Sequence, residues 1–315
     1  MVSMRTVKIF WIFCLLVASL VVNSCTSHVS QDVQETVGVR IPVLKANEIY
    51  VFKNNDLIAY DVITKRETSF LDRNNQYFYY FFDGDSDFYT AGDSDELGFV
   101  VYSITKKEIT EIKKMHDNEY IFPLARDANS FLYFFAQGTT SDVMNYREKG
   151  IMDENVIVVY DGFTWRELKN TRVDRHNILT GKLIGKQLYY SVANPLDADS
   201  QIDLYCVDIS NDMAQPQLVR ENLLSDLLLS YKGQLLLEEK EGNIRYGDHV
   251  FPCLTSDFCW VVESKGLFLS VMQDGTLKVF DIETGDVVDN VPSFLSFRVK
   301  DEKLIVYCDG EMKEY

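Results

Sequence analysis

The sequence predicts an all-β protein made of one repeated sheet unit, and three observations support this fold class. Alternating strand patterns recur along the chain, short polar turns separate them, and helical periodicity is almost absent. The 315 residues are 46% hydrophobic and 25% charged, which is a globular composition that can bury a large core. Together these features favour a single β-propeller, in which each sheet buries its faces against its neighbours.

The clearest copy of the unit is residues 275–288, GTLKVFDIETGDVV. One strand ends at Phe280 and Asp281, a polar turn follows over 283–285, and a second strand begins at Asp286. The same pattern recurs along the chain around an anchor aromatic residue. The anchors are Tyr60, Tyr102, Tyr160, Tyr205, Tyr246, Phe280 and Tyr315.

Successive anchors are 42, 58, 45, 41, 34 and 35 residues apart. A period of about 40 residues built from strands is typical of a propeller blade, so we expect seven blades, with six or eight as alternatives. The longest interval contains residues 138–154, which we interpret as an inserted polar surface loop. The seventh unit stops at Tyr315, before its last strand. Residues 36–44, TVGVRIPVL, have strand composition, and we expect this N-terminal strand to close the ring.

The first 24 residues predict a secretory signal peptide. Arg5 and Lys8 precede the apolar run Ile9–Val22. This run has 14 residues, fewer than the roughly 20 that a membrane-spanning helix needs. A permanent transmembrane anchor is therefore the weaker interpretation.

Residues 22–25, Val-Asn-Ser-Cys, resemble the lipobox of bacterial lipoproteins, with Asn23 as a departure from the usual pattern. The resemblance implies that Cys25 becomes the lipidated first residue of the mature chain. Lipid there would anchor the protein without spanning the membrane, because each buried methylene contributes about 0.8 kcal/mol. An ordinary signal peptide with a cysteine near its cleavage site is the alternative. The expected boundaries are 1–24 for the signal peptide, 25–35 for a polar tether and 36–315 for the β-propeller.

The chain is strongly acidic. Its net charge is −17, and loss of Arg5 and Lys8 with the signal peptide makes it −19. This charge argues against nucleic acid as a partner, since phosphate binding needs a basic face. It argues equally against electrostatic docking on anionic lipid head groups, so the lipid is the only membrane attachment expected. The expected location is the bacterial cell envelope, at the outer membrane or the cell surface.

Four cysteines remain besides Cys14 and Cys25. Export permits disulfide bonds, and Cys253 and Cys259 are the only close pair. Spacing alone leaves the pairing open, and four buried free thiols are an equal alternative. The four residues concerned are Cys206, Cys253, Cys259 and Cys308.

Residues 275–288 also resemble the aliphatic-Asp-x-x-Thr-Gly hairpin of quinoprotein repeats, without the tryptophan that usually follows. No unit has the Trp-Asp and Gly-His signature of true WD40 blades. Over residues 36–315 the chain thus resembles bacterial quinoprotein-like and WD40-like propeller lipoproteins. The resemblance implies the architecture and leaves the function open, because propellers host enzymes, binding modules and scaffolds.

Residues 83–96, DGDSDFYTAGDSDE, contain six acidic side chains, and the alternation of Asp83, Asp85 and Asp87 suggests a calcium loop. Phe88 stands where an EF-hand loop needs glycine, however, and no glutamate closes the loop. We interpret the segment as two acidic turns around a short strand at 88–91.

Two further segments have competing interpretations. Residues 160–165, YDGFTW, approximate the Asp-box of sialidase-like propellers, but Gly162 follows Asp161 with no residue between them. A turn with Trp165 packed between sheets is the favoured interpretation. Residues 76–82, QYFYYFF, could form an aromatic platform for sugars, although such a row of strand formers is more often buried between blades.

Enzyme motifs are missing from the sequence. The histidines have no zinc-type spacing, and there is neither a nucleophile elbow nor a phosphate loop. Carboxylate pairs for glycoside hydrolysis could be chosen freely from 48 acidic residues, so choosing them would prove nothing. We assign no catalytic, cofactor-binding or metal residue and expect no cofactor. The four histidines are His28, His116, His176 and His249.

The leading hypothesis is a non-enzymatic, lipid-anchored envelope propeller that binds another protein or a glycan through its loop faces. The alternative is a propeller enzyme, such as a glycoside hydrolase or lyase, with carboxylates at the mouth of the central channel. Inward-facing acids with raised pKa values would favour the enzyme. A quinone- or calcium-dependent enzyme is a third possibility without visible ligands.

Overall fold

The computed structural model describes most of the chain from residue 45 onward. Residues 1–44 lie outside the described part, as do the short segments 54–55, 70–75, 84–85, 94–97, 106–107, 115–118, 128–131, 140–153, 162, 194–200, 240–241, 254–258 and 301–302. The predicted signal peptide, tether and N-terminal strand therefore fall outside the described residues. So does Cys25.

The described chain is all-β and forms seven antiparallel sheets of three or four strands, in chain order. The first sheet contains β1 (Glu48–Lys53), β2 (Asp56–Asp61) and β3 (Arg66–Ser69). The second contains β4 (Gln76–Asp83), β5 (Ser86–Asp93), β6 (Gly98–Thr105) and β7 (Glu108–Lys114). The third contains β8 (Glu119–Asp127), β9 (Leu132–Thr139), β10 (Glu154–Tyr160) and β11 (Trp165–Asp174).

The C-terminal half continues in the same way. The fourth sheet contains β12 (Asn177–Ile184), β13 (Gln187–Ala193), β14 (Ile202–Asp208) and β15 (Gln217–Arg220). The fifth contains β16 (Leu228–Tyr231), β17 (Gln234–Glu239), β18 (Asn243–Tyr246) and β19 (His249–Pro252). The sixth contains β20 (Cys259–Val262), β21 (Leu267–Val271), β22 (Leu277–Asp281) and β23 (Val287–Val291), with one 3₁₀ turn at Glu263–Lys265. The seventh contains β24 (Phe294–Lys300), β25 (Lys303–Cys308) and β26 (Glu311–Glu314).

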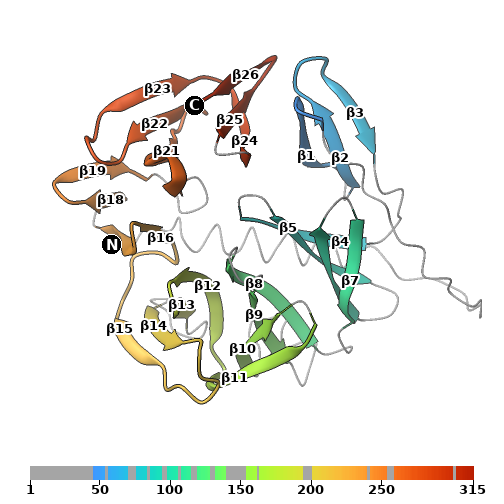
Figure 1. The fold of residues 1–315 in the computed structure, drawn as a ribbon, viewed down its shortest axis with the longest axis vertical. Coiled ribbons are helices and arrows are strands. Elements are labelled where there is room, and N and C mark those ends of the chain that lie inside the picture. The colour runs from blue at the N-terminus through green and yellow to red at the C-terminus, as the bar shows by residue number, and fades with distance from the viewer. Residues whose placement is uncertain are drawn as a thin grey trace, which may run out of the picture.

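The sheets surround a common centre in chain order, which is a propeller-like arrangement (Figure 1). The first strands of neighbouring sheets contact one another there, β8 with β12, β12 with β16 and β16 with β20. Gly181 on β12 permits one close approach, because a Cβ atom at this position would lie 2.9 Å from the Cβ atom of Leu124 on β8. The strands nearest the centre therefore pack directly against one another.

Both faces of a sheet are apolar, because its side chains alternate between the two neighbouring sheets. On β21, Leu267 and Leu269 join one buried cluster with the seventh sheet, whereas Phe268 joins another with the fifth sheet. On β22, Val279 and Phe280 divide in the same way. Successive residues of a strand point to opposite faces, so a sheet between two neighbours needs apolar residues at nearly every position.

The first sheet packs against the last. The Tyr307 hydroxyl on β25 donates a 3.0 Å hydrogen bond to the Ala46 carbonyl, and Gly310 N donates to the Val62 carbonyl at 3.1 Å. Lys65 and Asp309 form an ion pair across the same contact at 2.7 Å. Ile49 and Val62 are buried against Tyr307. The two ends of the described chain thus meet.

Several outer strands carry a β-bulge. The register shifts between the third and fourth strands of the second, third, fourth and sixth sheets, and in the second, fourth and sixth it leaves the single extra residues Ile112, Val219 and Val288. Bulges interrupt the row of backbone groups at an edge and discourage pairing with another strand. β26 pairs with β25 without such a shift.

The predicted repeat corresponds to the last hairpin of each sheet. Six of the seven anchor aromatics lie in the strand before the hairpin turn, but Tyr315 follows β26 and ends the described chain. The predicted loop at 138–154 was wrong at its ends. Gly138 lies in β9 and pairs with Asn155, and Glu154 begins β10. Strand pairing there outweighs the polar character of the sequence.

Replacement of a buried phenylalanine should cost far more stability than replacement of an exposed one. Phe268 is 0% exposed and packs on Phe251 with 4.9 Å between ring centroids, whereas Phe163 is 92% exposed. Phe268→Ala should lower the free energy of unfolding by about 3 to 5 kcal/mol through lost burial and a cavity. Phe163→Ala should change it by no more than about 0.5 kcal/mol. Urea denaturation of both variants checks this, and equal losses would contradict the assigned core.

Candidate binding surface

The acidic segment at 83–96 contributes a hairpin. Asp83 ends β4 and Asp87 lies in β5, and their strands pair directly through Asp83 and Ser86. The strand predicted at 88–91 is confirmed but is longer, Ser86–Asp93. Asp85 lies outside the described residues. Within the described part of the chain, no group of three or more His, Cys, Asp or Glu side chains is arranged to hold a metal ion.

The Asp161 side chain caps the turn between β10 and β11. Its carboxylate accepts hydrogen bonds from Phe163 N at 2.9 Å, Thr164 N at 2.7 Å and Thr164 Oγ1 at 2.9 Å. These bonds hold the pKa of Asp161 below its usual value. Trp165 packs on Phe135 and Tyr160 of its own sheet, with centroid distances of 5.3 and 4.8 Å. The Asp-box-like segment therefore forms a structural turn.

Aspartates cap the corresponding turn in two other sheets, where an aspartate also ends the anchor strand. Asp61 accepts hydrogen bonds from Ile63 N and Thr64 N, and Asp281 accepts them from Glu283 N and Thr284 N. In the case of Asp61 the bonds lower the pKa, the bond from Thr64 contributing most. Among the described carboxyl groups, every resolved pKa shift is downward. The groups concerned are Glu48, Asp61, Asp161, Asp208, Asp274, Glu283 and Asp289.

The two described histidines lie in structural positions. His176 Nδ1 is 2.6 Å from the Asp174 carbonyl, in the turn between the third and fourth sheets. The His249 ring lies against the turn that contains Gly285, where a Cβ atom would come within 2.5 Å of Nδ1 and where φ is +76°. Glycine is needed there for both reasons. His28 and His116 lie outside the described residues.

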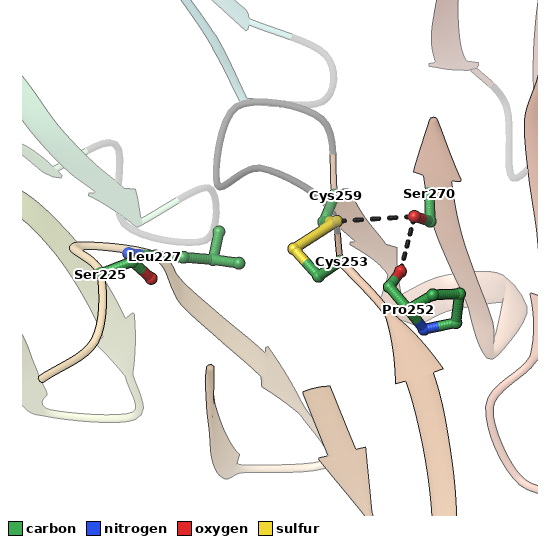
Figure 2. Close-up of a disulfide and its surroundings, with 6 residues drawn as sticks. All are labelled: Ser225, Leu227, Pro252, Cys253, Cys259 and Ser270. Carbon is green, nitrogen blue, oxygen red and sulfur yellow. Dashed lines mark hydrogen bonds between the residues drawn. A yellow bond between two sulfur atoms is a disulfide. The ribbon is translucent and has the colours of Figure 1, made fainter. Parts of the chain in front are cut away.

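A disulfide joins Cys253 to Cys259 (Figure 2). It links the end of β19 to the start of β20 and so connects the fifth and sixth sheets. The Ser270 hydroxyl lies 3.7 Å from the Cys259 sulfur and donates a 2.6 Å hydrogen bond to the Pro252 carbonyl. Sequence spacing left this pairing open. The structure also places a half-buried thiol at Cys206 and a buried one at Cys308.

Turns of the fifth and sixth sheets meet in a charged cluster. Lys232 N donates to Glu263 at 2.8 Å, and Lys232 Nζ donates to Glu283 at 2.5 Å. Hydrogen bonds from Lys232 and then Tyr231 lower the pKa of Glu283. Lys232 also lies 5.3 Å from the centre of the Tyr231 ring, which makes an edge contact with Tyr246. The charges are paired with one another, so the cluster mainly connects the two sheets.

A second link connects the sixth and seventh sheets. Asp289 on β23 accepts hydrogen bonds from the Tyr315 hydroxyl at 2.6 Å and from Lys313 Nζ at 3.0 Å. Tyr315 also exchanges backbone hydrogen bonds with Leu304 at 2.9 and 3.2 Å. The C-terminal residue is thus fixed to two strands.

Exposed apolar side chains gather on the fourth sheet. All four residues of β15 are exposed, and both Leu218 and Val219 are 48% exposed. Met213 precedes this strand and Leu224 follows it, both exposed as well. We call Met213, Leu218, Val219 and Leu224 the β15 apolar surface. Sequence analysis missed it, although two adjacent aliphatic residues in QPQLVR break the alternation expected of a half-buried strand.

Comparison with known proteins finds no matching family model and no matching curated protein. Among solved structures, the chain is similar to the computationally designed protein Ika8, with 17% identity, a TM-score of 0.42 and coverage of 88% of this chain and 99% of that one. It is also similar to Raptor of Chaetomium thermophilum, with 13% identity, a TM-score of 0.48 and coverage of 90% and 28%. For Sqt1 of Saccharomyces cerevisiae the identity is 12% and the TM-score is 0.42, and the match covers 83% of this chain and 77% of that one. The chain spans little more than a quarter of Raptor. These similarities assign no function.

No helix of the described residues has the length and hydropathy needed to cross a bilayer.

Removal of the disulfide should destabilise the protein measurably. Closing a short loop of this kind contributes about 2 kcal/mol by the chain-entropy estimate. We expect the double variant Cys253→Ala and Cys259→Ala to lose about that much free energy of unfolding. Cys206→Ala serves as the single-thiol control and should lose less. Urea denaturation without reductant makes the comparison, and reductant should abolish the difference between wild type and the double variant.

The Asp289 link should make stability depend on pH. Its pKa lies below the unfolded value because Tyr315, and to a lesser extent Lys313, donates to the carboxylate. The stabilisation is therefore present above about pH 4 and is lost as the pH falls through the lowered pKa. Asp289→Asn should be less stable than wild type at pH 7, with a gap that narrows in acid. Glu314→Gln, in an exposed ion pair with Lys303, is the control and should show little change. A gap that does not depend on pH would contradict this assignment.

Proposed function

We propose that this protein is a lipid-anchored, non-enzymatic scaffold of the bacterial cell envelope that binds a partner protein. The β15 apolar surface carries this proposal, because exposed apolar side chains that lie next to one another, as Leu218 and Val219 do, are typical of protein contact sites. A glycan partner bound through the loop faces is the second candidate.

The disulfide supports export. Cys253 and Cys259 are both buried and bonded, and such bonds persist mainly in oxidising compartments. Export is what the signal peptide at 1–24 predicts, and lipid on Cys25 would then retain the protein at a membrane. The −19 charge of the mature chain disfavours electrostatic docking on anionic lipid head groups, so the lipid would be its membrane attachment.

The described carboxylates favour a scaffold over a glycoside hydrolase or lyase. A general acid in such an enzyme needs a raised pKa, and hydrolysis needs two suitably placed carboxyl groups. The repeated aspartates Asp61, Asp161 and Asp281 instead accept backbone hydrogen bonds in turns. Their side chains stabilise the hairpins.

We also propose that the sheets form a closed, seven-bladed ring. The contact between the first and last sheets supports closure. The seventh sheet has three described strands, whereas the five sheets between the first and the last have four, so a further strand beside β26 would complete it. Residues 36–44 are the candidate for this strand.

Anchoring and partner binding can be tested together in intact cells. Wild-type protein should fractionate with membranes, incorporate labelled fatty acid and crosslink to one envelope protein. Cys25→Ala should lose the label and the membrane association, whereas Cys14→Ala, in the apolar run of the signal peptide, should keep both. A membrane-bound protein without any crosslinked partner would shift the proposal to glycans, and binding to a glycan array would then decide.

A further inference from the structure

The β15 apolar surface extends along the outer strand of the fourth sheet. Met213 lies in the turn before β15, Leu218 and Val219 lie on it, and Leu224 lies in the connection to β16. β15 is the outermost strand of its sheet, as Figure 1 shows. Four of the eleven exposed large apolar side chains in the described chain thus lie within twelve residues.

The bulge on β15 determines how a partner can bind there. Leu218 lies opposite Tyr205 and Arg220 opposite Leu204, so Val219 is the extra residue between them. The bulge interrupts the ladder of backbone groups, which disfavours addition of a partner strand. It also interrupts the alternation of side chains, and Leu218 and Val219 are equally exposed. Recognition at this surface must therefore depend on apolar side chains.

Charge selects among the possible occupants. Residues 201–226 contain five acidic side chains and one basic residue, Arg220, and two cations from elsewhere offset part of this charge, because Arg166 of β11 pairs with Asp212 and Lys186 lies near Asp208. A second copy of this chain would bring the same excess of negative charge, and anionic lipid would add more. A protein segment with aliphatic side chains flanked by lysine or arginine satisfies both the apolar surface and its acidic surroundings.

We propose that the β15 apolar surface is the docking site for a basic, aliphatic segment of a partner protein. This inference rests on the proposed scaffold function and specifies where the partner binds and what chemistry it presents. The aliphatic side chains of the partner cover Leu218 and Val219, and its cationic residues face the surrounding carboxylates. The apolar contact supplies most of the affinity, and the charges supply orientation and association rate.

The sixth sheet provides a matched control. On β23, Val287 and Val288 are also adjacent, 49% and 50% exposed, and one of them is the extra residue of a bulge. They follow a turn as Leu218 and Val219 do. The exposed large apolar residues nearest to them in sequence are Leu295 and Met312, 7 and 24 residues after Val288, whereas Met213 and Leu224 each lie five residues from the β15 pair. The double variants Leu218→Ser with Val219→Ser and Val287→Ser with Val288→Ser therefore remove similar apolar area from equivalent positions.

Binding of labelled peptides to the purified mature protein tests the proposal. The probe is a short peptide of alternating leucine and lysine, compared with a leucine and glutamate peptide and a serine and lysine peptide. The first should bind, and the variant at Leu218 and Val219 should weaken it by about tenfold or more. The variant at Val287 and Val288 should stay within about twofold of wild type. Circular dichroism and urea denaturation confirm that both variants fold.

Several results would overturn the proposal. Failure of the leucine and lysine peptide to bind, equal binding of the serine and lysine peptide, or equal loss in both variants would each reject this surface. The proposal would also be rejected if the wild-type protein formed a dimer, or bound anionic vesicles, and only the Leu218 and Val219 variant lost that property. In cells, a partner that crosslinks equally to that variant would reject the docking site and leave the scaffold function standing. Absence of any crosslinked partner would reject the scaffold function. The peptide-binding result would still show whether the β15 apolar surface binds a basic, aliphatic segment.

Discussion

Burial of both faces of each sheet is the constraint on which the rest of this structure depends. On β25, Leu304 and Val306 face the sixth sheet, whereas Ile305 and Tyr307 face the first. No single sheet could bury two apolar faces alone, so each needs a neighbour on either side. The turns, the disulfide and the ion pairs adjust the positions of sheets that this packing already brings together.

The acidic character of the chain follows partly from how its hairpins are made. An aspartate after the anchor strand accepts backbone hydrogen bonds in the turns at Asp61, Asp161 and Asp281. Side-chain capping of this kind fixes the turn. Many negative charges therefore lie at sheet ends for structural reasons. Their sum nevertheless creates a field that any partner must match.

The last hairpin of each sheet could be predicted from the sequence because aspartate, glycine and threonine identify its turn. The inner strands could not be delimited as well. Strands such as β10 and β21 are buried on both faces and lack the alternation that would give their boundaries. The Cys253–Cys259 bond depends on two strands of different sheets meeting, which spacing does not reveal. The β15 apolar surface depends on a bulge, and a bulge is a matter of register between strands.

The meeting of the first and last sheets has a consequence for when the chain can complete its fold. The hydrogen bond between Tyr307 and Ala46 joins residues 261 positions apart, and Ile49 and Val62 are buried against the same tyrosine. A ribosome must therefore make nearly the whole chain before the first sheet can cover its apolar face. Such high contact order slows folding.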